Sequence, residues 1–197
     1  MTPRLVLASA SPRRAHILRS LGVPFRVLVV EVDESLLPGE PAERAAERLA
    51  RTKAEAVRGE TLPVLAADTL VVSNGRALGK PASRDEAAAM LRELAERTHF
   101  VVTGVCLKNG DRVVSGVEQT AVRFAPMSDQ EIVWYVATGE PDDKAGAYHV
   151  DGRAALFIES VEGSPSNVAG LPVRLLLRLA RQAGVPLGPS AEGPSLR

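Results

Sequence analysis

The stretch LVLASASPRR, residues 5–14, predicts how the chain begins its fold. Its first four residues form a continuous apolar run, which is typical of a buried β-strand. The polar turn from Ser9 to Ser11 follows, and Pro12 suits the first position of a helix whose N-cap is Ser11. Apolar residues then give that helix one buried face, and Gly22 ends it. We therefore expect a buried strand that turns directly into a helix, as in α/β proteins.

The rest of the chain mixes strand and helix patterns without a strict alternation. Apolar and β-branched runs predict strands over 25–32, 62–72, 98–107, 112–124 and 155–159. Amphipathic segments predict helices over 41–57, 83–94, 128–138 and 173–182. Asn74-Gly75 and Asn109-Gly110 are typical hairpin turns. We therefore expect a single α/β domain, residues 1–185, on a mixed β-sheet flanked by helices, and a flexible Pro/Gly/Ser-rich tail over 186–197.

The overall charge and the cysteine content exclude several classes of protein. The 197 residues include 24 basic and 24 acidic side chains, so the basic excess that general nucleic-acid binding needs is missing. A small anion needs only a local cluster of cations. No apolar run approaches the roughly 18–20 residues of a membrane span. The single cysteine, Cys106, forms no disulfide within the chain and is expected as a buried, inert thiol, which favours a reducing, cytoplasmic compartment.

Two arginines open the predicted first helix, where the helix dipole disfavours cations. Arg13 and Arg14 directly follow the serine-rich turn. The free backbone N–H groups of a helix start attract anions, and two adjacent cations at this position are explained if an anion neutralises them. The simpler interpretation is that both arginines point into solvent. The local pattern leaves these two interpretations open.

Two carboxylates follow or interrupt apolar strands. Asp68 interrupts the apolar run 64–72, where a carboxylate must be paired, bind a metal or accept structural hydrogen bonds. Glu34 belongs to the pair Asp33-Glu34 at the end of another strand, for which an exposed loop is the ordinary explanation. Taken singly, neither carboxylate identifies a site.

Three lysines complete the charged residues of interest. Lys80 lies between a glycine and a proline in a short, rigid loop, and Lys144 lies in a segment of small residues that lets backbone approach a ligand. Lys53 lies on a predicted helix, where solvent exposure is the ordinary expectation. Together, these cations and carboxylates are what a triphosphate–metal site needs, because carboxylates hold Mg²⁺ or Mn²⁺ while Lys and Arg neutralise phosphate oxygens. The two commonest phosphate loops are absent, and the histidines show no metal-ligand spacing.

Seven segments, in order along the chain, resemble those of one known family. They are LASASPRR (7–14), VDE (32–34), ARTKA (50–54), ADT (67–69), LGKP (78–81), DKAGAY (143–148) and the stretch from EGS (162–164) through Asn167 to GLP (170–172). In these segments the chain resembles the Maf family of nucleoside triphosphate pyrophosphatases, also called septum-formation inhibitor proteins. The resemblance runs from Leu5 to about Gly184, nearly the whole chain.

This resemblance implies a fold and a reaction. The fold is an elongated mixed β-sheet with a cleft between two lobes, similar to inosine-triphosphate pyrophosphatases. The reaction cleaves a nucleoside triphosphate to the monophosphate and pyrophosphate with a divalent cation, Mg²⁺ or Mn²⁺. Removal of non-standard nucleotides, a link to cell-division arrest and a homodimer are further expectations from the family, and nothing in the sequence locates a dimer interface.

The same resemblance implies residue roles by motif position. Asp68 is implied as the proton acceptor. From the chemistry of carboxylates we expect Asp68 and Glu34 to hold the cation. The further catalytic residues are Glu34, Lys53 and Lys80. Arg13 and Thr69 fall where the family tunes base specificity. We expect the substrate to be bound by Ser9, Arg13, Arg14, Thr69, Lys144 and Asp151.

The motif forms also indicate a branch of the family. The ADT and DKAGAY forms resemble the branch that acts on dTTP and UTP. The branch that acts on 7-methyl-GTP typically has a bulky aromatic before the arginines and Gln at the position of Thr69, and this chain has neither. One departure is Asp151, which replaces a glutamine of the dTTP/UTP branch, and a carboxylate cannot donate as an amide does. A pyrophosphatase for another or modified base, and a non-hydrolysing nucleotide-binding regulator of septum formation, therefore stay open as alternatives.

Overall fold

A computed structural model describes residues 2–187 of the chain, in which strands and helices mix throughout. The strands are β1 (Leu5–Leu7), β2 (Phe25–Val27), β3 (Val64–Ser73), β4 (Arg76–Leu78), β5 (Thr98–Asn109), β6 (Arg112–Phe124) and β7 (Ile158–Glu162). The α-helices are α1 (Pro12–Ser20), α2 (Ala42–Ala56), α3 (Arg84–Leu94), α4 (Asp129–Ala137), α5 (Pro165–Val168) and α6 (Val173–Ala183). Two short 3₁₀ helices are η1 (Ala145–Ala147) and η2 (Arg153–Phe157).

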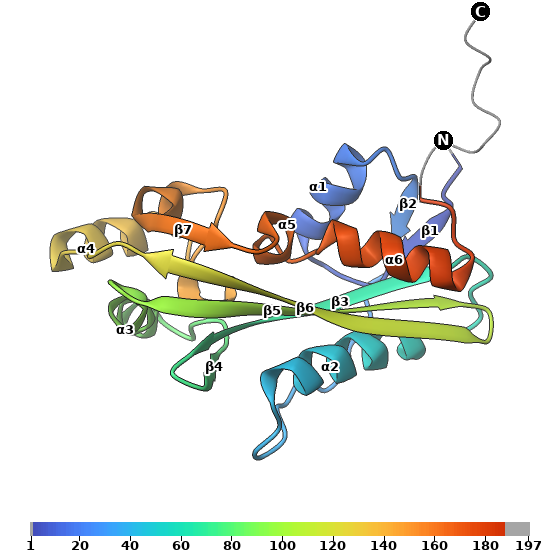
Figure 1. Ribbon diagram of the computed structural model, residues 1–197, viewed down its shortest axis with the longest axis horizontal. Helices are drawn as coiled ribbons and strands as arrows, with labels where there is room; N and C mark the ends of the chain where they lie inside the picture. Colours follow the sequence, from blue (N-terminus) through green and yellow to red (C-terminus); the bar gives the residue numbers. More distant parts are fainter. Residues whose placement is uncertain (1, 188–197) are drawn as a thin grey trace, which may run out of the picture.

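The strands form one mixed sheet, in the order β2-β1-β3-β5-β6-β7, with β4 paired to β3. The short β1 pairs in parallel with β2 and β3, whereas the long strands β3, β5 and β6 are antiparallel neighbours. Figure 1 shows these long strands running along an elongated molecule, with α2 on one face of the sheet and α1, α5 and α6 on the other. The mixed sheet flanked by helices is confirmed.

Two groups of buried side chains occupy the two ends of the elongated sheet and form two lobes (Figure 1). At one end, α1 and α6 pack against β1, β3 and β5, and Leu107 and Leu176 are fully buried there. At the other end, α3, α4, η1 and η2 enclose Phe124 and Tyr135, which are also fully buried. The long strands connect both lobes, so that the middle of the sheet lies between them.

The edge of β3 is open at its middle. β5 pairs with one edge of β3 over residues 64–72. On the other edge, β1 pairs with β3 only as far as Leu65, and β4 begins to pair at Val71. Because side chains alternate along a strand, Asp68 and Thr69 in this gap point to opposite faces of the sheet. The opening between the lobes therefore brings side chains from both faces to one place.

Local signals predict several element boundaries correctly. The side chain of Ser11 accepts the N–H of Arg14 at 3.4 Å and caps α1, which begins with a proline as expected. Gly22, with a φ of +68°, follows the helix. The Asn74–Gly75 turn joins β3 to β4, as its dipeptide indicates. These elements are specified by adjacent residues, which explains why the sequence predicts them.

The strand expected over 25–32 is too long. In the structure β2 ends at Val27, because its partner β1 is only three residues long. The N–H of Leu28 donates the last bond of this pair to the carbonyl of Leu7 at 3.0 Å. Beyond that bond β2 has no further neighbouring strand among residues 2–187, and the chain leaves the sheet as a loop that carries Glu34.

The strand expected over 155–159 begins late, at Ile158. The residues before it form η2, because the carboxylate of Glu140 accepts the backbone N–H groups of Arg153 and Ala154 and turns the chain. The β5–β6 turn is also shifted: Asn109 pairs with its partner across the ladder, so the turn begins one residue later than predicted.

Two further expectations concern segments beyond the sheet. The tail expected over 186–197 lies, after residue 187, outside the described residues. Within residues 2–187, no helix is long and apolar enough to cross a membrane.

Candidate functional site

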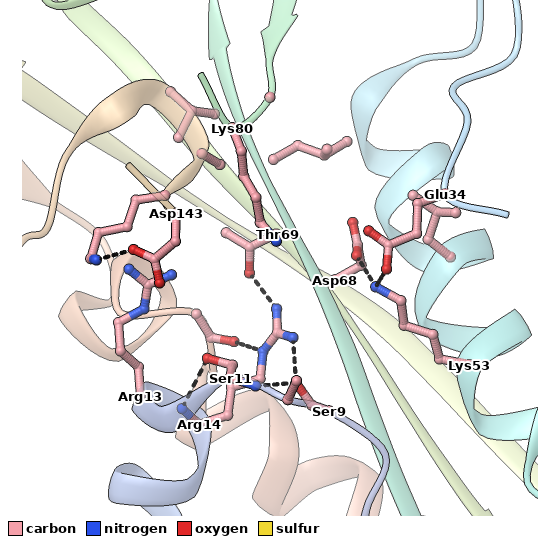
Figure 2. Close-up of a pocket in the computed structure, with 18 of the residues that line it drawn as sticks. Ser9, Ser11, Arg13, Arg14, Glu34, Lys53, Asp68, Thr69, Lys80 and Asp143 are labelled. Carbon is pink, nitrogen blue, oxygen red and sulfur yellow. Dashed lines mark hydrogen bonds and ion pairs between the residues drawn. The ribbon is translucent and has the colours of Figure 1, made fainter. Parts of the chain in front are cut away.

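A cavity of about 560 Å³ lies at the open edge of β3, between the two lobes. Its walls come from the β1–α1 turn, from β3, from the loop after β2 and from the two loops that carry lysines (Figure 2). The charged side chains that line it are the cations Arg13, Arg14, Lys53, Lys80 and Lys144 and the carboxylates Glu34, Asp68 and Asp143. Five cations against three carboxylates give this cavity an excess of two positive charges, although the chain as a whole is neutral.

Lys53 lies between two carboxylates on the α2 side of the cavity. Its Nζ is 2.5 Å from Oδ1 of Asp68 and 2.8 Å from Oε1 of Glu34 (Figure 2). Asp68 and Lys53 are buried, whereas 58% of the Glu34 side chain is exposed. Of the interpretations that the sequence left open for Asp68, pairing with a cation is the one observed. The ordinary expectation for Lys53, a solvated helix surface, is wrong, because α2 turns this lysine toward the sheet.

Arg14 is buried on the opposite face, and its hydrogen bonds go to uncharged oxygens. Its Nε donates to the carbonyl of Gly170 at 2.8 Å, Nη1 to Ser9 Oγ at 3.0 Å and Nη2 to Thr69 Oγ1 at 3.0 Å. Burial lowers the pKa of Arg14 from its usual value, and the nearby carboxylate of Asp68 opposes that shift. Arg14 makes no ion pair with residues 2–187, so its charge is left for an anion in the cavity. The interpretation that Arg14 points into solvent is wrong.

The far wall of the cavity is formed by Arg13 and the loop before η1. Lys144 pairs with the carboxylate of Asp143, and Figure 2 shows the guanidinium of Arg13 beside them. Burial lowers the pKa of Arg13, while the charges of Asp143 and Asp151 oppose that shift. The exposed carboxylate of Asp143 thus pairs with Lys144 and acts on the charge of Arg13.

The loop that carries Lys80 is joined to this wall through backbone. The N–H of Gly146 donates to the carbonyl of Gly79 at 3.1 Å. Gly146 has a φ of +68°, and a Cβ at this position would lie 2.8 Å from the side chain of Val71, so only glycine lets the two loops approach β3 this closely. Lys80 itself is exposed, makes no ion pair with the described residues and extends into the cavity (Figure 2).

The structure brings nine of the ten predicted site residues into this one cavity. The exception is Asp151, which is exposed and does not line the cavity, although its charge acts on Arg13 and His149. Sequence reasoning missed Asp143, although it stands next to Lys144 in the DKAGAY segment. It also missed Thr103, a buried polar residue in the apolar stretch of β5, which is the kind of interruption that pointed to Asp68.

The carboxylates can hold a divalent cation only together with other ligands. Residues 2–187 contain no group of three or more His, Cys, Asp or Glu side chains that could hold a metal ion. Glu34 and Asp68 nevertheless converge on one point, which Lys53 Nζ marks. Mg²⁺ is commonly held by one or two carboxylates plus phosphate oxygens of a substrate and water. This donor set fits a cation that arrives with a phosphate ligand.

Comparisons with known proteins agree with this geometry. Residues 4–183 match the family described as Maf-like protein. A protein named dTTP/UTP pyrophosphatase from Symbiobacterium thermophilum is 50% identical over 186 residues, which cover 93% of this chain and 96% of that protein. One of the same name from an Anaeromyxobacter species is 52% identical over 198 residues, covering 98% and 96%. Another from Aromatoleum aromaticum is 48% identical over 200 residues, covering 93% and 97%.

Proposed function

The chain belongs to the family of Maf-like proteins, and from this premise we propose that it is a pyrophosphatase that hydrolyses dTTP and UTP to the monophosphate and pyrophosphate. Relatives with that name match it at about half of all positions over nearly their full length. The observation that carries the proposal is the cavity at the open edge of β3, where an excess of positive charge lies beside the buried pair of Asp68 and Lys53.

The charge of the cavity suits a nucleoside triphosphate. A free triphosphate carries roughly four negative charges near neutral pH, and one divalent cation reduces this to about two. The excess of two positive charges on the cavity walls balances that remainder. Arg14 contributes most directly, because its N–H groups beyond the three described bonds stay free to bind an anion.

We infer that water attacks the α-phosphorus and that Asp68 accepts its proton. Oδ1 of Asp68 is held by Lys53, and the described hydrogen bonds leave Oδ2 free to orient the water. As the new P–O bond forms, the bond from the α-phosphorus to the bridging oxygen breaks, and pyrophosphate leaves with the electron pair. The cations Arg13, Arg14, Lys53, Lys80 and Lys144 stabilise the charge that builds up on the phosphates.

We propose that Glu34 and Asp68, with phosphate oxygens of the substrate, hold the divalent cation that the family implies, Mg²⁺ or Mn²⁺. Such a cation polarises phosphate oxygens and lowers the pKa of bound water. If the carboxylates held such a cation, Lys53 Nζ would be free to turn from them toward a phosphate. Replacement of the lysine by the cation would explain why both carboxylates pair with the ammonium group of Lys53.

The preferred base is the part of this proposal that a substrate panel tests. We expect pyrophosphate release from dTTP and UTP at kcat/KM values at least about 10-fold above those for CTP, 7-methyl-GTP and pseudouridine triphosphate, the discrimination expected of a few base contacts. A preference for 7-methyl-GTP or another modified base would contradict the dTTP/UTP assignment. Binding of nucleotide without pyrophosphate release in Mg²⁺ or Mn²⁺ would instead identify a non-hydrolysing regulator.

Other expectations stay predictions. The homodimer, the absence of nucleic-acid partners, the cytoplasmic location and the link to cell division follow from the family or from composition. The buried Cys106, whose pKa burial raises to about 12, agrees with the inert thiol that was expected.

A further inference from the structure

The hydroxyl of Thr69 belongs to a chain of hydrogen bonds that leads away from the cavity. Arg14 Nη2 lies 3.0 Å from Thr69 Oγ1, and Thr69 Oγ1 lies 3.0 Å from Thr103 Oγ1. Thr103 Oγ1 in turn lies 3.3 Å from the backbone carbonyl oxygen of Asn167. Thr103 and Asn167 are fully buried, whereas Thr69 lines the cavity.

Only one direction of these bonds satisfies every contact. A guanidinium can only donate, so Thr69 accepts from Arg14. A carbonyl oxygen can only accept, so the hydroxyl hydrogen of Thr103 goes to Asn167. Thr103 has no second hydrogen, and Thr69 must therefore donate its own hydrogen to Thr103. The hydrogen of Thr69 is thus used inside the protein, and one lone pair is left facing the cavity.

The hydroxyl of Ser9, which also accepts from the guanidinium of Arg14, is in the opposite state. Its Oγ accepts from Arg14 Nη1 at 3.0 Å and from the N–H of Ser11 at 3.2 Å. Both lone pairs are then used, and its hydrogen stays free to donate. Ser9 suits a phosphate oxygen, which can only accept, whereas Thr69 cannot bind a phosphate oxygen at all.

We infer that Thr103 is a positioning residue for substrate selection: it holds the Thr69 hydroxyl as an acceptor, and Thr69 then accepts a hydrogen bond from an N–H or O–H of the nucleoside part of the substrate. This inference rests on the proposed function, because it assigns a contact within the same cavity. Two groups of dTTP and UTP supply such a donor, namely the imide N–H of the base and a hydroxyl of the sugar.

Two substrate analogues distinguish these sources. UTP methylated at the imide nitrogen lacks the N–H, and thymidine triphosphate without its 3′-hydroxyl lacks that O–H. We expect the wild-type protein to hydrolyse one of the two with a kcat/KM about 10-fold or more below its parent nucleotide, because an acceptor in the cavity is left unpaired. The analogue that is discriminated identifies the donor.

The variant Thr103→Val removes the internal acceptor and frees the Thr69 hydroxyl to rotate, so its hydrogen can turn toward the cavity. We expect discrimination against the same analogue to fall below about threefold. The variant's kcat/KM for the parent nucleotide should fall through a higher KM rather than a lower kcat, because the change removes one hydrogen bond to the bound substrate. Thr103→Ser keeps the hydroxyl and should restore the wild-type ratio.

Thr120→Val is the matched control. Thr120 is as buried as Thr103, and its hydroxyl accepts from Asn167 Nδ2 at 3.0 Å and donates to the carbonyl of Ser164 at 3.2 Å, without contact to Thr69. This variant should lower thermal stability as Thr103→Val does and leave the ratio of kcat/KM values for parent and analogue unchanged.

Two results overturn this inference and leave the proposed function standing: discrimination in Thr103→Val equal to that of the wild type, or no discrimination by the wild type itself. Failure of the wild type to release pyrophosphate from dTTP and UTP overturns the proposed function as well.

Discussion

Lys53 is held by two carboxylates of unequal burial, and this difference separates their roles. Asp68 is anchored in the middle of β3 and buried, so its position is set by the sheet. Glu34 lies in a loop and is largely exposed, so it can follow a ligand that enters. A base must be fixed relative to the reacting phosphorus, whereas a residue that only helps hold a cation can adjust. Burial therefore favours Asp68 as the base.

Asp68→Asn tests this assignment. The amide has nearly the same shape but cannot accept the proton of water, so we expect kcat to fall at least about 100-fold, the low end for loss of a general base. KM for dTTP should change less than kcat, because the cationic walls stay in place and Glu34 still helps to hold the cation. Pyrophosphate release measures both quantities.

Asp111→Asn is the control. It makes the same change of charge in the exposed β5–β6 turn, away from the cavity, and should retain wild-type kinetics. Turnover near the wild-type value in Asp68→Asn would exclude Asp68 as the base.

At the scale of elements, the approach of α2 to the sheet sets the position of Lys53. Gly104 of β5 pairs directly with Asp68, and a Cβ on Gly104 would lie 2.1 Å from the carbonyl oxygen of Ala46. The buried face of α2 consists mainly of alanines, which lets the helix lie close against the strands. Lys53 lies two helical turns after Ala46 and reaches Asp68 from this close position.

Gly104→Ala should therefore affect the catalytic site from a distance. The added methyl group meets backbone, which cannot rotate away, so α2 must shift outward. We expect a loss of about 1–3 kcal/mol in the free energy of unfolding, the usual range for overpacking. We also expect kcat/KM to fall about 10-fold, because small displacements of catalytic groups are costly. Chemical denaturation and dTTP hydrolysis measure the two effects.

Gly116→Ala provides the comparison on the other face of the sheet. A Cβ there would meet the tip of the Leu175 side chain at 3.1 Å, and a leucine side chain can move. The loss of stability should stay below about 1 kcal/mol with kinetics unchanged. Equal effects of both substitutions would mean that the distance between α2 and β5 does not position Lys53.

At the scale of the whole molecule, the features that could be predicted from the sequence are those set by residues adjacent in the chain. The Ser11-Pro12 helix start and the Asn74-Gly75 turn are of this kind, and the segments that resemble the family carry nine of the ten site residues. The opening in β3 could not be predicted, because it depends on where two short strands end on a third. Asp151 was expected from the position of a glutamine in the resembling branch, and its side chain does not line the cavity.

One buried histidine in the core of the second lobe makes the fold sensitive to acid. His99 is fully buried, its Nε2 is 2.9 Å from the hydroxyl of Tyr148, and its Nδ1 has no hydrogen-bond partner among the described residues. Its ring packs edge-on against Phe124 and Tyr148. A charged imidazolium would need an acceptor for its second N–H, and none is present. Burial accordingly lowers the pKa of His99 to about 4.

We predict that His99 destabilises the fold as the pH falls from about 6.5 toward 4, because the unfolded chain binds a proton to this residue that the folded protein refuses. Above about pH 6.5 both states are neutral there and the effect vanishes. Between pH 7 and 4.5 the loss in the free energy of unfolding should reach about 2–3 kcal/mol.

The variant His99→Gln tests this prediction, because glutamine can still bond Tyr148 but does not titrate. Denaturant unfolding at both pH values gives the loss for each protein, and comparing the two losses cancels any constant cost of the substitution. Carboxylates titrate equally in both proteins, so the variant should lose about 2 kcal/mol less than the wild type. Equal losses would show that His99 takes up its proton in the folded state, which requires the aromatic cluster around it to open.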